Sequence, residues 1–114
     1  MNKRLVNMFC LNHRVAAYIP ATIDVNTEID NTAYVDHMAA IMSECFGGAT
    51  SSPANGYWMS NSVGLVKEKT TIVFAYAADL DKLDAVIDYL IQIKSELSQE
   101  AMALEVDGKM YFIE

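Results

Sequence analysis

The sequence predicts one mixed α+β domain of the ferredoxin-like kind, a split β-α-β arrangement with the element order β-α-β-β-α-β. Three observations predict it: segments whose apolar residues alternate, two segments whose apolar residues recur every three or four positions, and the order of these segments. With 114 residues, 53% of them hydrophobic, the chain suits one core. We expect two helices on one face of an antiparallel sheet, with an added C-terminal β-hairpin.

The first half of this domain is a strand followed by a helix. Residues 14–23 alternate as a strand does, and Pro20 would then lie at an edge or bulge because it has no N–H to donate. Residues 30–32 offer a helix cap. An apolar stripe at helical spacing follows, made of Tyr34, Met38, Ile41, Met42 and Cys45. Gly47 and Gly48 supply a left-handed stop to this helix.

The middle of the chain predicts a polar loop and then a central strand. Residues 50–62 are rich in Ser, Asn, Gly and Pro, so we expect at most a short irregular strand around residues 57–59. Gly64 begins the next segment, and residues 70–76 are β-branched and aromatic on both faces. This composition is typical of a strand with neighbours on both sides.

The last third predicts a helix and a hairpin. Asp79 is expected to cap a helix whose apolar stripe comprises Leu83, Val86, Ile87, Leu90, Ile93 and Leu97. Residues 101–106 alternate again, Asp107-Gly108 is a strong two-residue hairpin signal, and residues 109–113 form the last strand. One face of the resulting sheet stays uncovered, and its apolar side chains would be buried most simply against a second copy, so a homodimer is expected.

Residues 1–13 are expected to form an N-terminal arm or an extra strand, outside the domain formed by residues 14–114. Lys3 and Arg4 precede an apolar stretch that Asn7 interrupts. The stretch is too short and too broken for a signal peptide or a membrane span.

Charge and cysteine content limit the partners. Fifteen Asp and Glu against eight Lys and Arg give a net charge of −7, which disfavours direct nucleic-acid binding and anionic membranes and favours a basic protein partner. Cys10 and Cys45 form no disulfide framework and no zinc-site spacing. We therefore expect a protein of the host cytoplasm without metal or cofactor.

A binding surface is predicted where the chain concentrates its aromatic and turn-prone residues. Trp58 is compatible with core packing or with exposure, whereas alternation turns Tyr57 outward. Glu68, between two lysines, would approach Trp58 across a hairpin. Solvated surface is the ordinary alternative for the acids of the second helix. The predicted surface comprises Gly47, Gly48, Thr50, Tyr57, Trp58, Glu68, Asp81, Asp84 and Asp88. No residue is predicted to be catalytic, because no nucleophile elbow or phosphate loop is present.

Several separate motifs resemble a family of small proteins carried by phages, plasmids and integrative elements of Firmicutes. They are Ile19–Thr22, Phe46–Thr50, Trp58 after a glycine, Val66–Glu68, Leu97–Ala101 and Glu105–Phe112. The resemblance covers roughly residue 18 to the end, while residues 1–13 depart from it. It implies a mobile-element setting and no site residues.

Together these features lead to a non-enzymatic counter-defence inhibitor of the anti-CRISPR or anti-restriction type. It would bind a basic host defence protein or nuclease through the acidic helix face and the Tyr57–Trp58 loop. The alternative is an oligomeric sponge that sequesters a signalling nucleotide, with Trp58 stacked on it and the backbone of Gly47, Gly48 and Thr50 near its phosphates. A third hypothesis is an enzyme that uses Glu68 as a base.

Overall fold

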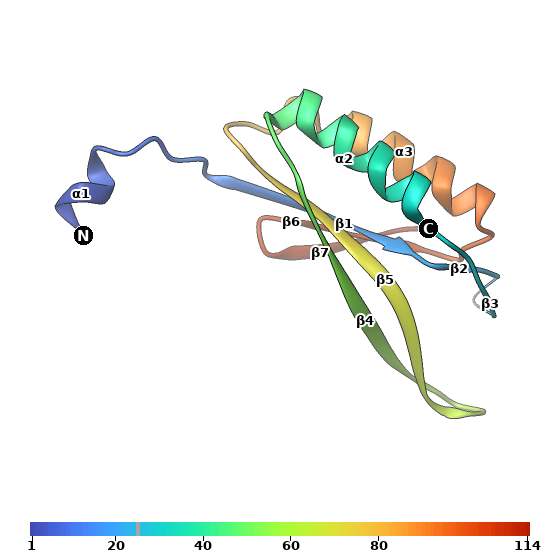
Figure 1. Ribbon diagram of the computed structural model, residues 1–114. Coiled ribbons are helices and arrows are strands. Elements are labelled where there is room, and N and C mark those ends of the chain that lie inside the picture. Colours follow the sequence, from blue (N-terminus) through green and yellow to red (C-terminus); the bar gives the residue numbers. More distant parts are fainter. Residues whose placement is uncertain (25) are drawn as a thin grey trace.

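A computed structural model describes residues 1–24 and 26–114, in which two helices pack on one face of a five-stranded antiparallel sheet (Figure 1). The helices are α1 Lys3–Val6, α2 Thr32–Phe46 and α3 Leu83–Glu96. The strands are β1 His13–Pro20, β2 Thr22–Ile23, β3 Thr27–Glu28, β4 Thr50–Ser60, β5 Gly64–Ala77, β6 Met102–Val106 and β7 Lys109–Ile113.

The sheet has the strand order β4-β5-β1-β6-β7, and every neighbouring pair is antiparallel. The predicted mixed α+β class is therefore confirmed. The order differs from that of a simple split β-α-β unit, because β7 adds a fifth strand beyond β6. Strands β2 and β3 pair only with each other, so the strand predicted over residues 14–23 ends at Pro20 and a separate small hairpin follows.

The core lies between the sheet and the helices α2 and α3. Alternate residues of β1, β5 and β6 point toward the helices and meet their apolar stripes. The fully buried large side chains in this layer include Val15, Ile19, Met38, Met42, Val73, Val86, Leu90, Ile93, Leu97 and Met102. This is the packing that the two helical stripes predicted.

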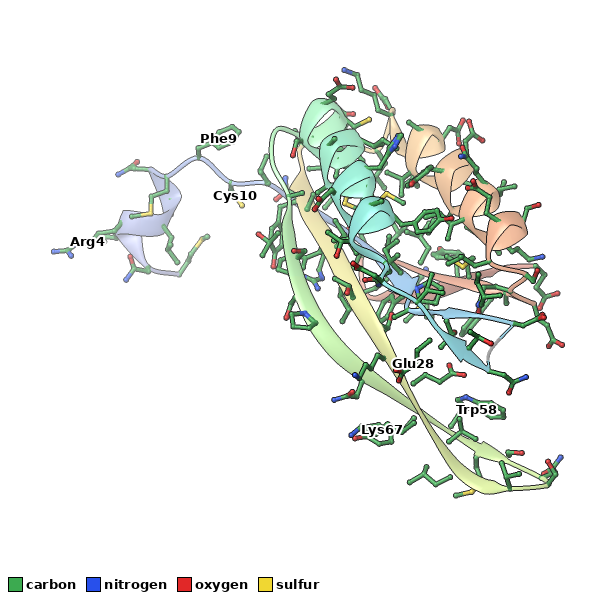
Figure 2. All side chains as sticks on the ribbon, turned by 45° about the vertical axis from the view of Figure 1, so that its right-hand side comes forward. Arg4, Phe9, Cys10, Glu28, Trp58 and Lys67 are labelled. Carbon is green, nitrogen blue, oxygen red and sulfur yellow. The ribbon has the colours of Figure 1, made fainter. Side chains whose placement is uncertain are left out.

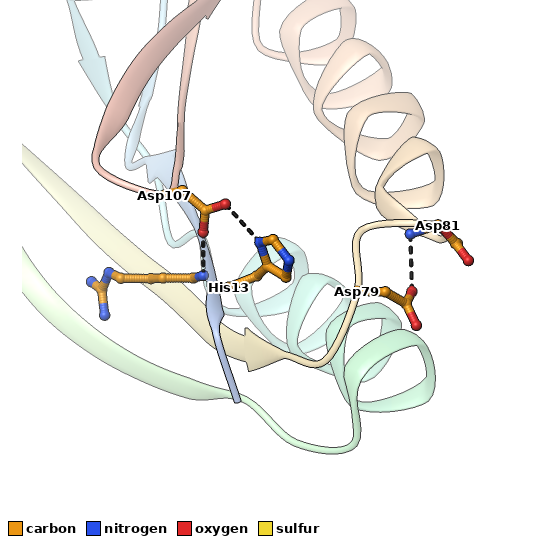
Figure 3. Close-up of polar contacts among 5 residues, drawn as sticks. His13, Asp79, Asp81 and Asp107 are labelled. Carbon is orange, nitrogen blue, oxygen red and sulfur yellow. Dashed lines mark hydrogen bonds and ion pairs between the residues drawn. The ribbon is translucent and has the colours of Figure 1, made fainter. Parts of the chain in front are cut away.

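The turns that bound these elements use the predicted residues with one exception. Gly47 has a φ of 99° and ends α2, and Asp107 and Gly108 have φ values of 53° and 82° in the two-residue turn between β6 and β7. Asp79, however, does not cap α3. Its carboxylate accepts a hydrogen bond from the N–H of Asp81 at 3.0 Å (Figure 3), within a turn before the helix begins at Leu83.

The prediction of a short irregular strand in residues 50–62 is wrong. Strand β4 runs from Thr50 to Ser60 and pairs with β5 over its whole length, from Thr50 opposite Phe74 to Ser60 opposite Gly64. Because β4 is an edge strand with a single partner, Pro53 costs it no obligatory hydrogen bond. Cross-strand pairing outweighs the low strand propensity of its residues.

Two further features extend from this body in Figure 1. The tip of the β4–β5 hairpin projects beyond β1, and residues 1–12 project from the other end, with α1 apart from the sheet and its helices. Their separation gives a longest dimension of 53 Å. Among the described residues, no helix combines the length and apolarity needed to cross a membrane.

Candidate functional site

The projecting half of the β4–β5 hairpin creates the concave region of interest. The ladder between β1 and β5 ends at the pair Pro20–Thr70, with one further bond from the Ala21 N–H to the Lys69 carbonyl oxygen, so β5 residues 64–68 are paired with β4 alone. The β2–β3 hairpin and the segment before β6 then approach the open edge of β5. Two hollows form at this corner.

Both hollows are lined by Glu68 and Lys69. The larger, of about 370 Å³, is lined by Thr22, Asn26, Glu28, Val66, Lys67, Glu68 and Lys69. The smaller, of about 200 Å³, is lined by Tyr18, Pro20, Gly56, Glu68, Lys69, Thr70, Gln99, Ala101, Met102 and Ala103. We call the two hollows together the Glu68 site.

Glu68 is the polar group of this site whose bonding is incomplete. One of its carboxylate oxygens, Oε1, is inaccessible to solvent and has no hydrogen-bond partner, the only such side-chain atom among the described residues. A buried polar atom without a partner costs about 1–3 kcal/mol, and more when charged. Because Glu68 lines both hollows, its carboxylate is suited to a ligand that brings a donor or a positive charge.

Gly56 lies directly opposite Glu68 and leaves space beside it. A Cβ at this position would meet only the Glu68 carbonyl oxygen, at 3.8 Å, which is ordinary contact. The absence of a side chain is thus not imposed by backbone crowding. It keeps the smaller hollow open.

Two other polar side chains of the wall, those of Gln99 and Thr70, are bonded within the protein. Gln99 donates from Nε2 to the carbonyl oxygens of Thr22 (2.9 Å) and Leu97 (3.3 Å), which ties the segment after α3 to β2. The Thr70 hydroxyl donates to the Ile19 carbonyl oxygen at 3.0 Å. These bonds fix the walls and leave the Glu68 oxygen as the unsatisfied group.

The site has charges of both signs, and Trp58, which lines neither hollow, lies next to it on the hairpin. Glu28, Lys67 and Trp58 gather around the projecting hairpin in Figure 2. Trp58 pairs with Val66 and therefore shares a sheet face with Glu68, at a diagonal separation of about 7 Å, and 46% of its surface is exposed. Tyr57 is also exposed but points to the opposite face.

The predicted binding surface is not one surface. Gly47, Gly48 and Thr50 lie at the far end of β4, and Thr50 is about 26 Å from Trp58 along the strand. Asp81, Asp84 and Asp88 are exposed at the α3 side of the molecule, in the helical layer. Of the nine residues, the structure brings Glu68 and Trp58 together on one face.

Sequence reasoning missed the rest of the site. Tyr18, Gly56, Lys69 and Gln99 come from four separate segments; the β1–β5 and β4–β5 registers bring the first three together, and hydrogen bonds to Thr22 and Leu97 hold Gln99 beside them. One signal was present. Counting back from the turn at residues 61–63 places Gly56 opposite Glu68.

A second polar cluster lies on the uncovered sheet face, and its groups are already paired. The Arg14 guanidinium stands over the Phe74 ring at 4.4 Å, and its Nε is 3.6 Å from a Glu105 carboxylate oxygen. Arg14 also donates to the Tyr76 hydroxyl at 3.3 Å. This cluster therefore stabilises the sheet face and offers no open ligand group.

At the β6–β7 turn, Asp107 accepts from the Arg14 N–H at 2.8 Å and lies 2.7 Å from His13 Nδ1 (Figure 3). The hydrogen bond to His13, and then that from Arg14, hold the pKa of Asp107 below its usual value. Among the described residues, no group of His, Cys, Asp and Glu is arranged to hold a metal ion.

Comparison with known proteins gives the fold a precedent. No protein-family model matches the chain, and no curated protein sequence matches it. Among solved structures, a phage SAM lyase in complex with S-methyl-5′-thioadenosine matches with a TM-score of 0.66 at 14% identity, over 93% of this chain and 94% of that one. A phage SAM lyase in the apo state matches with a TM-score of 0.61 at 16% identity, over 90% and 89%.

This comparison corrects the predicted function. The chain shares its fold, over nearly its whole length, with an enzyme. The expected non-enzymatic anti-CRISPR or anti-restriction inhibitor, and its alternative as a nucleotide sponge, are therefore set aside. Two solved structures of phage SAM lyase are among those that this chain resembles in fold.

Proposed function

We propose that this protein is a lyase that cleaves S-adenosylmethionine (SAM) and releases S-methyl-5′-thioadenosine at the Glu68 site. The observation that carries the proposal is the buried Glu68 oxygen without a partner, at the wall of two adjoining hollows. The fold shared with phage SAM lyase supports the choice of substrate.

The charges of the site suit this substrate. SAM carries a sulfonium, an ammonium and a carboxylate, so it has two positive groups and one negative group. Glu68 and Glu28 would face the positive groups, and Lys69 would meet the carboxylate. The net charge of −7 would raise the local concentration of a substrate that is positive overall.

Trp58 is the residue suited to the adenine ring. Its indole shares the face of Glu68 and is about half exposed. Since Trp58 and Glu68 are diagonal neighbours on one face, one ligand could place its purine on the indole and its sulfonium near the carboxylate. In this arrangement the ligand lies along the open edge of β5.

The reaction breaks the bond between the sulfonium sulfur and the methionine Cγ. Both electrons of that bond go to sulfur, which becomes the neutral thioether of S-methyl-5′-thioadenosine. The substrate's own carboxylate closes on Cγ and forms a lactone, so no proton is transferred. This route needs positioning alone, which can supply about 7–11 kcal/mol, whereas a carboxylate base would have to remove a weakly acidic C–H proton.

Glu68 then acts as a binding and orienting group. Its charge favours the sulfonium substrate over the thioether product, because only the substrate carries a positive sulfur. A charged hydrogen bond or ion pair of this kind is worth about 1.5–3 kcal/mol. We expect the binding free energies of SAM and of S-methyl-5′-thioadenosine to differ by this amount, with SAM bound more tightly.

The proposed role is counter-defence by removal of SAM in the host cytoplasm. Restriction–modification systems that depend on SAM would lose their methyl donor or cofactor. The resemblance to mobile-element proteins and the phage origin of the matched lyases support this role.

We also propose that β1, β4, β5 and β6 form a ferredoxin-like unit to which β7 is added, supported by the order β4-β5-β1-β6.

The test compares the wild type with Glu68→Gln, which keeps the shape and removes the charge. Formation of S-methyl-5′-thioadenosine from SAM is followed by liquid chromatography, with Glu96→Gln on α3 as the matched control. We expect activity to fall by about 10- to 100-fold in Glu68→Gln and to be unchanged in Glu96→Gln. Equal activity of all three proteins would contradict the assignment of the site, and an inactive wild type would contradict the function.

A further inference from the structure

The proposed function makes no use of residues 1–12. Helix α1 within this segment has no buried residue, and the described hydrogen bonds of residues 1–12 are all local. Figures 1 and 2 show the segment projecting from the body, with Arg4, Phe9 and Cys10 along it. We call residues 1–12 the arm.

The arm exposes more apolar surface than a solvated tail needs. Leu5, Val6 and Met8 are each more than half exposed, and Phe9 is 87% exposed. Contiguous exposed apolar side chains of this kind mark a surface that is covered by another molecule. The charge of the arm indicates which molecule.

The arm is basic and the remainder of the chain is acidic. Lys3 and Arg4 are its only charged side chains, so the arm contributes +2 to a total of −7 and the other residues carry −9. A second copy of this chain is therefore electrostatically complementary to the arm. An anionic lipid surface shares that sign, but it would also face the much larger negative charge of the body.

A hollow of suitable chemistry lies between the body and the base of the arm. It measures about 520 Å³ and is lined by Phe9, Leu11, Cys45, Phe46, Gly47, Gly48, Tyr76, Ala78 and Asp79. Its aromatic and aliphatic walls match the exposed side chains of the arm. Asp79 at its rim, with Asp81 two residues on, offers carboxylates to Lys3 and Arg4.

We propose that two copies exchange their arms, each arm placing Leu5, Val6 and Met8 in the hollow at the base of the partner's arm. Because Phe9 and Leu11 line the hollow of their own chain, the two base segments would run side by side about a two-fold axis near Cys10. Such an isologous contact is closed and uses the same surfaces on both copies.

The first test uses Cys10 as a probe, since it is exposed and unpaired. A Cys45→Ala protein is treated with a mild thiol oxidant, and a Cys10→Ala protein is the control. Two thiols bridge only if their Cα atoms come within about 7 Å. We expect a covalent dimer of the first protein at dilute concentration and none of the second. No covalent dimer of the first protein would overturn the proposal.

The second test separates arm exchange from other contacts. Mass in solution is measured by light scattering for the full chain, for a chain lacking residues 2–12, and for Lys3→Glu/Arg4→Glu. We expect deletion or charge reversal to raise the dissociation concentration of the dimer by about tenfold or more. Adding Asp79→Lys/Asp81→Lys to the Lys3→Glu/Arg4→Glu protein should restore dimer formation.

Three outcomes would overturn the proposal: a monomeric full chain, association that is unchanged by the deletion, or a monomer whose arm instead binds vesicles of anionic phospholipid. None of them bears on SAM cleavage, which is measured separately on the same proteins. Failure of the arm proposal and failure of the proposed function are therefore distinguishable.

Discussion

At the scale of single residues, Glu68 is the residue on which the proposed function mainly depends, and the sequence predicts its surroundings only in part. The sequence places it between two lysines before a strong strand and suggests an approach to Trp58. That its Oε1 is buried without a partner, and that Gly56 lies opposite, are features of the folded chain. Since these are contacts between distant segments, local pattern could not predict them.

Asp107 is a residue for which the structure predicts a pH effect. Its folded-state pKa is lowered by the hydrogen bond to His13 and then by that from Arg14, so its contribution to stability is present above its ordinary value of 3.8. That contribution is lost as the pH falls through the lower folded-state pKa. We expect Asp107→Asn to lose stability above pH 4 and to differ less from the wild type at pH 3.

Urea unfolding midpoints between pH 3 and pH 7 measure this effect. Asp36→Asn, at an exposed position of α2, serves as the control and should follow the wild type at each pH. A stability difference between Asp107→Asn and the wild type that widened toward low pH would contradict the role of the charged carboxylate.

At the scale of elements, the helices and the last hairpin were predicted well and the β4 strand was not. The two helical stripes and the Asp107-Gly108 turn are local signals, and the structure uses them directly. Strand β4 has a loop-like composition, and its pairing with β5 is what makes it a strand. The extra length of this hairpin forms a wall of the Glu68 site, so the element that was not predicted is also part of the proposed site.

The end of α2 gives a test of element boundaries. Gly47 has a φ of 99° and no neighbouring atom within 4 Å of an added Cβ, so Gly47→Ala should cost about 1 kcal/mol through backbone strain alone. Gly48 is equally open but does not have a left-handed backbone. In thermal unfolding, Gly48→Ala should therefore be about as stable as the wild type. Equal losses of stability in the two variants would contradict the role of the left-handed Gly47 in ending α2.

The β4–β5 hairpin gives a test that separates folding from binding. Gly56→Val introduces a side chain on the face of Glu68, where the smaller hollow lies, in a backbone conformation that other residues adopt. Asn55→Val places the same side chain on the opposite face of β4. Strand propensity should keep both variants as stable as the wild type, within about 1 kcal/mol.

Calorimetric titration with SAM distinguishes the two variants. We expect Gly56→Val to bind at least about tenfold more weakly, a change of roughly 1.4 kcal/mol, and Asn55→Val to bind as the wild type does. Equal affinity of Gly56→Val and the wild type would place the ligand elsewhere.

At the scale of the whole molecule, the acidic charge is compatible with several kinds of positively charged partner. The sequence suggested that a net charge of −7 selects a basic protein partner. The same field is suited to a positively charged small substrate and to the basic arm of a second copy. The predicted homodimer and the basic host partner stay predictions, and composition alone could not choose among these partners because all of them are positive.

The overall fold class could be predicted because its signals are periodic and repeated along the chain. The proposed lyase activity could not be predicted in this way, because fold and composition do not specify a site. It rests instead on the convergence of β1, β4, β5 and the segment before β6 around one carboxylate. These segments meet there because of the strand register and the strand lengths, which cannot be predicted from single residues.

Product analysis after incubation with SAM tests the central claim most directly. Mass spectrometry would quantify SAM and its products over time for the wild type, for Glu68→Gln and for a reaction without protein. We predict S-methyl-5′-thioadenosine and homoserine lactone in equal amounts, formed by the wild type well above the spontaneous rate. Formation of S-adenosylhomocysteine, or SAM that decays no faster than without protein, would contradict the account.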